Sequence, residues 1–468
     1  MRSVYRTAAH CIGLALVGWL ASGGSPVQAQ NNGGGGGGAG QLPAGVIVSP
    51  DGVLRVKTFA DKTGQLGKKR LAEARARLGA DLAKPSESRK ISLNRLEAAI
   101  VDRAARGEQP TEEMKYLAGL TRLQYVFFYP ETKDIVVAGP AEGFMQDPSG
   151  RPVGITTGRA VLELQDLATA LRAYPPAGDR THVISVSIDP TQAGLKRMQD
   201  WLVSISGSVR PGDAQRIVAG LKQQLGLHNV TVGGISPRTH FAQVMVEADY
   251  RMKLIGIGIE QPAVKMATYV GRASPTDVSR NAMQRWFFTP NYDCVRVSDD
   301  SLAMELVGQG VKLIGENELV QADGTRANAA VGNKASDAFC DSFTANYPQI
   351  AARTPVYAQL RNLIDMAVAA AYIQKQDYYG QAGWKMEMLG DEQKFPIETY
   401  ETPKTVETAC TAIWKGSRLM TPVGGGVHIE PTEALEPSHL LKDEQGEVKA
   451  ARQKVKLDAL ANGQWWWD

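Results

Sequence analysis

The stretch THFAQVMVEADYRMKLIGIGIE (residues 239–260) is expected to be the element around which the rest of the chain packs. It has no proline and no glycine before Gly256, and it is too long for one strand, so it predicts a central helix at about 239–255. Two apolar stripes on opposite sides follow helical spacing: Phe241, Val244, Met245, Ala248, Met252 and Ile255 on one, and Val246, Tyr250 and Leu254 on the other. A helix that is apolar on two sides is expected to be covered on both.

Four charged residues lie between these stripes. Glu247 precedes Arg251, and Asp249 precedes Lys253, each at the i, i+4 spacing and in the order that favours an ion pair along a helix. If the helix is buried, these charges are costly unless each is satisfied, so the four residues are also the candidate binding residues. Residues 244–254 alternate between apolar and polar almost as a strand does, and a strand is the alternative interpretation.

The rest of the chain mixes helical and strand patterns, which predicts an α+β fold of several small mixed layers around the central helix. A β-hairpin is predicted over 44–58, and Ser92 is placed to cap a helix. Short apolar runs separated by turn residues predict an antiparallel meander at about 285–315. The glycines at 424–426 are interpreted as a tight turn.

The N-terminus has the features of a secretory signal peptide. Two arginines precede a short apolar run, IGLALVGWL (residues 12–20), and small residues near Ala29 offer a cleavage site. Residues 1–29 are therefore predicted to be removed, and the mature protein is expected to be periplasmic or extracellular. The glycine-rich segment 30–43 is predicted to be a flexible tether.

Composition and breaker residues divide the remaining chain into four predicted parts. These are an N-terminal α+β domain (44–178), a central α/β domain with the meander (179–375), a small C-terminal β element (376–440) and a charged tail (441–468). The whole chain has a formal net charge of +3, and this near-neutral balance gives no electrostatic basis for binding nucleic acid. No segment after the signal is apolar over a length that spans a membrane.

No local motif for catalysis or metal binding is found. The histidines are scattered and lack the His-Glu-x-x-His spacing, and no Gly-x-Ser-x-Gly elbow is present, so no metal or cofactor is predicted and the catalytic residues stay unknown. A zinc site assembled from residues far apart in sequence remains open. Any two of Cys294, Cys340 and Cys410 could form a disulfide in an oxidising compartment, and all three could instead be buried small side chains.

Four segments together resemble a family of exported bacterial proteins, of planctomycete type, that is classified only as a domain of unknown function. They are VFFYPETKDIVVAGPAEGF (126–144), VEADYRMKLIGIGIE (246–260), CVRVSDDSLAMELVGQGVKLIG (294–315) and TPVYAQLRNLIDMAVAAAYI (354–373). The resemblance covers about residues 44–430. It implies export, and it implies no reaction, cofactor or catalytic residue.

The function expected from these observations is that of an exported soluble protein without turnover, which binds a partner or has a structural role in the cell envelope. Its partner would be an envelope protein or polymer. The alternative is an exported hydrolase whose site is assembled from residues that are distant in sequence.

Overall fold

The computed structural model describes most of the chain after the predicted signal peptide. The described residues are 42–49, 52–59, 61, 63–205, 211–274, 282–321, 323, 325–328, 332–411, 414–415, 418–419, 423–454, 457, 460–461 and 463–468. The predicted signal peptide (1–29) and residues 30–41 of the predicted tether lie outside them. Leu42 and Pro43, assigned to the tether from sequence, instead begin the first strand.

The larger of two main sheets has nine described strands and mixes parallel and antiparallel neighbours. In spatial order they are β1 (Leu42–Val48), β2 (Val53–Phe59), β15 (Thr405–Val406), β9 (His228–Gly233), β8 (Ile184–Asp189), β18 (Val423–Ile429), β10 (Ala282–Pro290), β13 (Val311–Val320) and β14 (Arg326–Asn328). The antiparallel pair β1 and β2 is the hairpin predicted over 44–58, which is confirmed.

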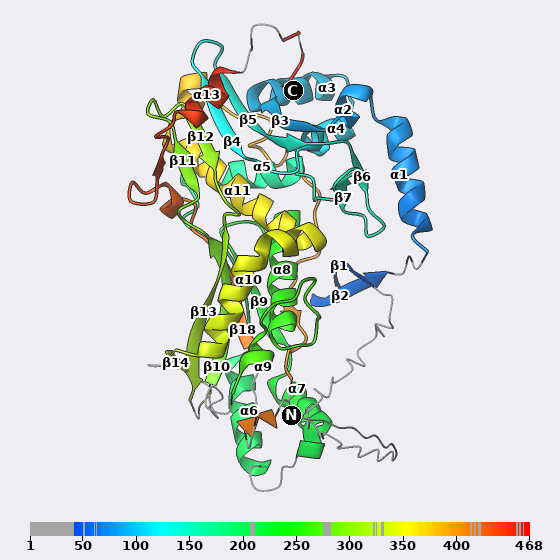
Figure 1. Ribbon diagram of the computed structural model, residues 1–468, viewed down its shortest axis with the longest axis vertical. Coiled ribbons are helices and arrows are strands. Elements are labelled where there is room, and N and C mark those ends of the chain that lie inside the picture. The colour runs from blue at the N-terminus through cyan, green and yellow to red at the C-terminus, as the bar shows by residue number, and fades with distance from the viewer. Residues whose placement is uncertain are drawn as a thin grey trace, which may run out of the picture.

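The second main sheet has seven described strands and occupies the upper half of the molecule in Figure 1. In spatial order they are β19 (Leu441–Lys442), β11 (Val295–Val297), β12 (Ala303–Leu306), β4 (Tyr125–Tyr129), β5 (Asp134–Ala141), β3 (Ser86–Ser92) and β20 (Trp466–Trp467). Two further short pairs complete the described strands: β6 (Phe144–Gln146) with β7 (Pro152–Gly154), and β16 (Trp414–Lys415) with β17 (Arg418–Leu419).

Helices cover these sheets and connect them. The described α-helices are α1 (Gln65–Arg77), α2 (Ala80–Ala83), α3 (Leu93–Ala105), α4 (Glu112–Lys115), α5 (Leu164–Ala173), α6 (Gln192–Ile205), α7 (Ala214–Leu225), α8 (His240–Gly256), α9 (Tyr269–Arg272), α10 (Lys334–Arg353), α11 (Pro355–Lys375), α12 (Tyr378–Ala382) and α13 (Glu447–Gln453). The Ser92 hydroxyl accepts a hydrogen bond from the Arg95 amide, so the predicted cap of α3 is confirmed, as is the α+β class.

Helix α8 is the predicted central helix, and the strand alternative is excluded. The Thr239 hydroxyl caps it, and every residue from Phe241 to Gly256 is buried. On one side α8 packs against β18, β8 and β10, and on the other against α11 and α5. Both apolar stripes are therefore covered.

The four strands predicted as one meander are divided between the two sheets. Strands β10 and β13, of nine and ten residues, pair antiparallel along their whole length from Ala282–Leu319 to Pro290–Val311. The β11–β12 hairpin between them leaves this sheet, and β12 pairs with β4 in the other. The single meander does not form because two long strands that bond directly to each other leave no room for a hairpin between them.

The predicted divisions at 178, 375 and 440 do not coincide with the sheets. The predicted C-terminal element (376–440) supplies β15 and β18 to the nine-stranded sheet, and the predicted tail (441–468) supplies β19 and β20 to the seven-stranded sheet. Trp465 and Trp467 are buried, and β20 pairs with β3. One hydrophobic core cluster contains buried residues from both sheets, among them Val126 of β4 and Val186 of β8.

The glycines at 424–426 do not form a turn but belong to the first half of strand β18. A Cβ atom on Gly426 would lie 1.8 Å from the carbonyl oxygen of Val186 in β8, and one on Gly425 would lie 1.9 Å from that of Trp286 in β10. The close approach of the two neighbouring strands therefore requires glycine here.

Candidate functional site

The site is built around a cleft of about 800 Å³. Its walls come from β1 and β2, the end of α3 with residues 107–116, the connection before β7, the start of α5, the N-terminal half of α8 and the segment 393–400. Polar and charged side chains converge on it from elements that are far apart in sequence, among them Arg151, Glu163, His240 and Glu247. A concave space with a few convergent polar groups is the usual form of a ligand site.

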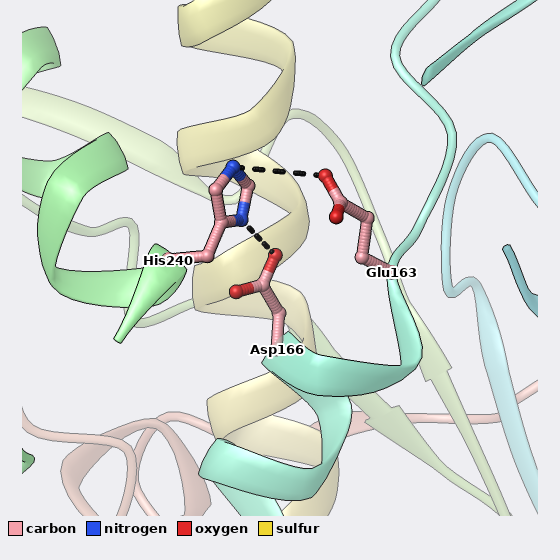
Figure 2. A group of neighbouring side chains, drawn as sticks. All are labelled: Glu163, Asp166 and His240. Carbon is pink, nitrogen blue, oxygen red and sulfur yellow. Dashed lines mark hydrogen bonds and ion pairs between the residues drawn. The ribbon is translucent and has the colours of Figure 1, made fainter. Parts of the chain in front are cut away.

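One wall of the cleft carries a cluster of two carboxylates and an imidazole, drawn in Figure 2. His240 is the first residue of α8, Asp166 lies in the first turn of α5, and Glu163 immediately precedes α5. The starts of two helices therefore meet here. The positive end of a helix dipole stabilises nearby carboxylates and disfavours a cation. The two helix starts therefore favour the charged forms of Glu163 and Asp166, whereas a protonated His240 would be disfavoured here without these carboxylates.

The imidazole of His240 lies between the two carboxylates (Figure 2). Its Nδ1 is 2.8 Å from Oδ2 of Asp166, within hydrogen-bond distance, and its Nε2 is 3.6 Å from Oε1 of Glu163. Burial would lower the pKa of His240, but the charges of Asp166 and Glu163 outweigh it and raise the pKa to about 9. His240 is therefore an imidazolium at neutral pH.

The cluster is nearly closed to solvent on the side of Asp166 and open on the side of Glu163. The side chains of Asp166, Glu163 and His240 are 6, 11 and 16% exposed, and only Glu163 and His240 line the cleft. Burial raises the pKa of Glu163. The Gln165 amide donates to Glu163 at 2.8 Å, and Oδ1 of Asp166 is buried without a hydrogen-bond partner in the described structure.

Residues of this cluster are placed to hold a metal ion. One potential ligand atom from each lies within 4.8 Å of the others. Zinc takes imidazole nitrogen at about 2.0–2.1 Å and carboxylate oxygen at about 2.0–2.2 Å. Two such ligands in a tetrahedral arrangement lie about 3.4 Å apart, so Nε2 of His240 and Oε1 of Glu163, at 3.6 Å, are spaced for one ion.

Of the four candidate binding residues predicted from sequence, only Glu247 reaches the cleft. Glu247 pairs with Arg251 at 3.3 Å, as the spacing predicted, and also with Arg151 of the segment before β7. Arg251 pairs in addition with Glu260 at 2.7 Å. This chain of charges fixes one edge of the cleft and satisfies the buried Glu247.

Asp249 and Lys253 form the second predicted pair, with Nζ 2.7 Å from Oδ2, but they lie on the opposite side of α8. Lys253 also donates to the carbonyl oxygens of Ile188 in β8 and Gly425 in β18. Burial raises the pKa of Asp249 to about 6 and lowers that of Lys253. The pair therefore attaches the helix to the sheet and takes no part in the cleft.

Cys294, Cys340 and Cys410 are all buried and unbridged in the structure. Burial raises the pKa of each thiol to about 12. A thiol with so high a pKa is a poor nucleophile at neutral pH, and the structure favours the interpretation of the three as buried small side chains.

The sequence gives no local signal for the His240 cluster. His240 is 74 residues from Asp166, and the two are brought together only by the packing of α5 against α8. Both carboxylates and the histidine lie at predicted helix starts. Sequence patterns can locate such starts, but they do not tell which two of them meet in the fold.

The fold and this cleft define an α+β protein with a buried histidine–carboxylate cluster. Within the chain, residues 186–269 match the model of the DUF1598 family, described as a protein of unknown function. The match contains the end of β8 and all of α6, α7, β9 and α8, and therefore His240, whereas Glu163 and Asp166 lie outside it. No curated protein and no solved structure matches the chain. Among the described residues, no helix is both long enough and apolar enough to cross a bilayer.

Proposed function

We propose that this is an exported metal-binding protein of the cell envelope, which takes up a divalent transition-metal ion at the mouth of the His240 cluster without catalytic turnover. Nε2 of His240 and the carboxylate of Glu163 are the protein ligands. Asp166 orients the ring by accepting a hydrogen bond from Nδ1, the arrangement of a carboxylate–histidine–metal site. The 3.6 Å spacing of Nε2 and Oε1 on the wall of an open cleft is the observation that carries the proposal.

The charge and chemistry of the cluster select the type of ion. With Nε2 deprotonated, the two carboxylates leave the cluster with two negative charges, which a divalent cation neutralises. One imidazole and carboxylate oxygens suit Zn²⁺, Mn²⁺ and Fe²⁺ better than the softer Cu⁺. The remaining coordination positions face the cleft, where a polar group of a partner can complete them.

Hydrolysis is the second candidate function. A metal ion with few protein ligands keeps open positions for water, and bound water is a nucleophile near neutral pH. The open face of the cluster toward the cleft is the feature that favours this alternative. Turnover of an envelope polymer or peptide by the zinc-loaded protein, lost in Glu163→Gln, would establish hydrolysis in place of binding alone.

Metal binding is tested by titrating the mature protein with Zn²⁺ and Mn²⁺ in a calorimeter. We expect one equivalent to bind to the unmodified protein and binding to be lost in His240→Asn and in Glu163→Gln. Asp166→Asn should bind about 10–100-fold more weakly, as changes to an orienting partner do. Melting curves of each variant show whether it is folded.

The matched control is His439→Asn. His439 also pairs with a carboxylate, that of Asp293 at 2.9 Å, but on the surface and with a single acidic partner. It should bind metal as the unmodified protein does. Equal binding in all variants, or none in the unmodified protein, would overturn the proposal.

Export is part of the same proposal, supported by the N-terminal pattern and by the resemblance to exported planctomycete-type proteins. N-terminal sequencing of the protein purified from its host should begin at Gln30. A mature chain that retains residues 1–29 would contradict export by this route.

A further inference from the structure

A second cavity, of about 220 Å³, lies between the helices α10 and α11 and the segment that leads into β4. Three arginines line it: Arg122, Arg159 and Arg361. None of the residues described as lining it is acidic. The other polar side chains in its wall, including Gln124 and Gln309, are neutral.

The positive charge in this cavity exceeds the negative charge beside it. Nε of Arg122 pairs with Oδ2 of Asp365 at 3.0 Å, and Asp365 is itself buried. Within the described part of the chain, neither Arg159 nor Arg361 has a carboxylate within 4.0 Å. Three guanidinium groups therefore share one carboxylate. Arg122 and Arg361 are half-buried and Arg159 is exposed. Two of the positive charges are thus partly removed from water beside the third, and an anion would compensate the excess.

Two of the arginines have N–H donors without a hydrogen-bond partner in the described structure. Nη2 of Arg122 and Nε of Arg361 are buried and lack a hydrogen-bond partner in the described structure. The contacts that Arg361 does make, to Gln309 at 3.4 Å and to Asn362 at 3.3 Å, are long.

The charges around Arg361 also favour a bound anion. Burial lowers the pKa of its guanidinium; Asp365 counteracts this, whereas Arg122 and Arg159 add to it. A bound anion would relieve this repulsion.

We propose that the cavity binds a tetrahedral oxyanion, a phosphate or sulfate group, between the guanidinium groups of Arg122, Arg159 and Arg361. The planar fork of N–H donors on arginine matches the oxygens of such a group, and these charge-assisted hydrogen bonds are strong. At about 220 Å³ the cavity is smaller than a typical pocket for a drug-sized ligand, so it accommodates the anionic group itself and little more. This site is separate from the His240 cluster and does not depend on metal binding.

The test is calorimetric titration at low ionic strength with inorganic phosphate, sulfate and glycerol phosphate, against chloride at equal ionic strength. We expect saturable binding of the tetrahedral anions and none of chloride. Tighter binding of glycerol phosphate than of free phosphate would identify a phosphate monoester as the natural source, and the reverse order would identify the free ion; both support the site.

Arg361→Gln and Arg159→Gln should each weaken phosphate binding by about tenfold or more, because each removes a charged donor. The Arg159 side chain is exposed, so its variant is expected to fold even if the other does not. Arg353→Gln is the control, since Arg353 is also exposed, lies on α10 and does not line the cavity. His240→Asn should bind phosphate normally. The proposal would fail if no anion binds saturably, or if Arg361→Gln and Arg159→Gln both bind as tightly as Arg353→Gln.

Discussion

Nδ1 of His240 lies 2.8 Å from Oδ2 of Asp166, and this contact joins the first turn of α8 to the first turn of α5. Because the hydrogen bond fixes the orientation of the ring, Nε2 is directed toward Glu163 and the cleft. The two helices are also held together at this point. The contact is therefore expected to contribute to both stability and binding, and the two contributions have different pH dependence.

The stability of the protein should fall above neutral pH. The pKa of His240 is raised from 6.5 to about 9 in the folded state, so the imidazolium stabilises the fold fully below pH 6.5 and this contribution is lost as the pH rises through 9. A shift of this size corresponds to about 3 kcal/mol. Urea unfolding between pH 6 and 10 should show a loss of this order, and His240→Asn should show a flatter profile. An identical slope in both proteins would contradict the raised pKa.

Metal binding should release a proton. Zinc requires the neutral imidazole, and at pH 7 it must displace a proton held with a pKa of about 9. The apparent affinity is therefore expected to rise about tenfold per pH unit between pH 7 and 9. Calorimetry in two buffers with different ionisation enthalpies measures the number of protons released. Binding without proton release would place the ion away from Nε2 of His240.

The buried pair on the other side of α8 should be strongly coupled. Lys253→Met leaves the charge of Asp249 buried without its cation, which is expected to cost about 3–5 kcal/mol of unfolding free energy. The double variant with Asp249→Leu removes both charges and should recover much of this loss. Denaturant unfolding of both single variants and the double variant measures the coupling.

The chain contains a matched control for the variants of Asp249 and Lys253. Lys196 and Asp200 have the same i, i+4 spacing and the same 2.7 Å distance, but their side chains are 53 and 62% exposed. Lys196→Met is expected to change stability by about 0–1 kcal/mol. Equal effects of Lys196→Met and Lys253→Met would show that burial does not govern the energy of the Asp249–Lys253 pair.

The contact between Arg89 and Asp468 should be needed for stability. The Arg89 side chain is fully buried in β3, and its Nε lies 2.8 Å from Oδ1 of Asp468 beside β20. Asp468→Asn weakens the anchoring of a buried cation and should cost about 1–3 kcal/mol, measured by urea unfolding. Asp299→Asn, which breaks a surface pair with Lys449, is the control and should have little effect.

The same contact predicts sensitivity to acid. Burial acts to raise the pKa of Asp468, but hydrogen bonds from Arg89 and Ser86 prevail and lower it. The stabilisation is therefore present above the usual pKa of an aspartate and is lost as the pH falls through the lowered value. The free energy of unfolding of Asp468→Asn should therefore be lower than that of the unmodified protein at neutral pH. It should also depend less on pH as the solution is made acidic. An unaltered acid profile would show that the pair is not formed in solution.

Local patterns in the sequence predicted the parts of the fold that depend on neighbours along the chain. The helical spacing of apolar residues located α8, and the i, i+4 spacing of Glu247 with Arg251 and of Asp249 with Lys253 predicted its two internal ion pairs. Ser92 marked the start of α3. Each of these signals arises within one helical turn, where side chains four residues apart are in contact whatever the rest of the molecule does.

The parts that were missed depend on contacts between distant segments. The cluster of Glu163, Asp166 and His240 and the three arginines of the smaller cavity come together only after the helices have packed. The first half of strand β18 was missed for a different reason, whereas its second half lies in the predicted C-terminal β element. Its glycines at 424–426 have the composition of a turn, and only the closeness of β8 and β10 explains why a strand needs them.

The position of β18 has a consequence for how the protein is made. This strand lies between β8 and β10, although it is encoded more than a hundred residues after either of them. A chain that grows from its N-terminus cannot join those two strands until residues 423–429 have left the ribosome, and until then their inner edges present unsatisfied backbone groups. An edge of β8 is therefore unpaired for about half of the synthesis of the chain, and the large sheet closes only when this late strand is inserted.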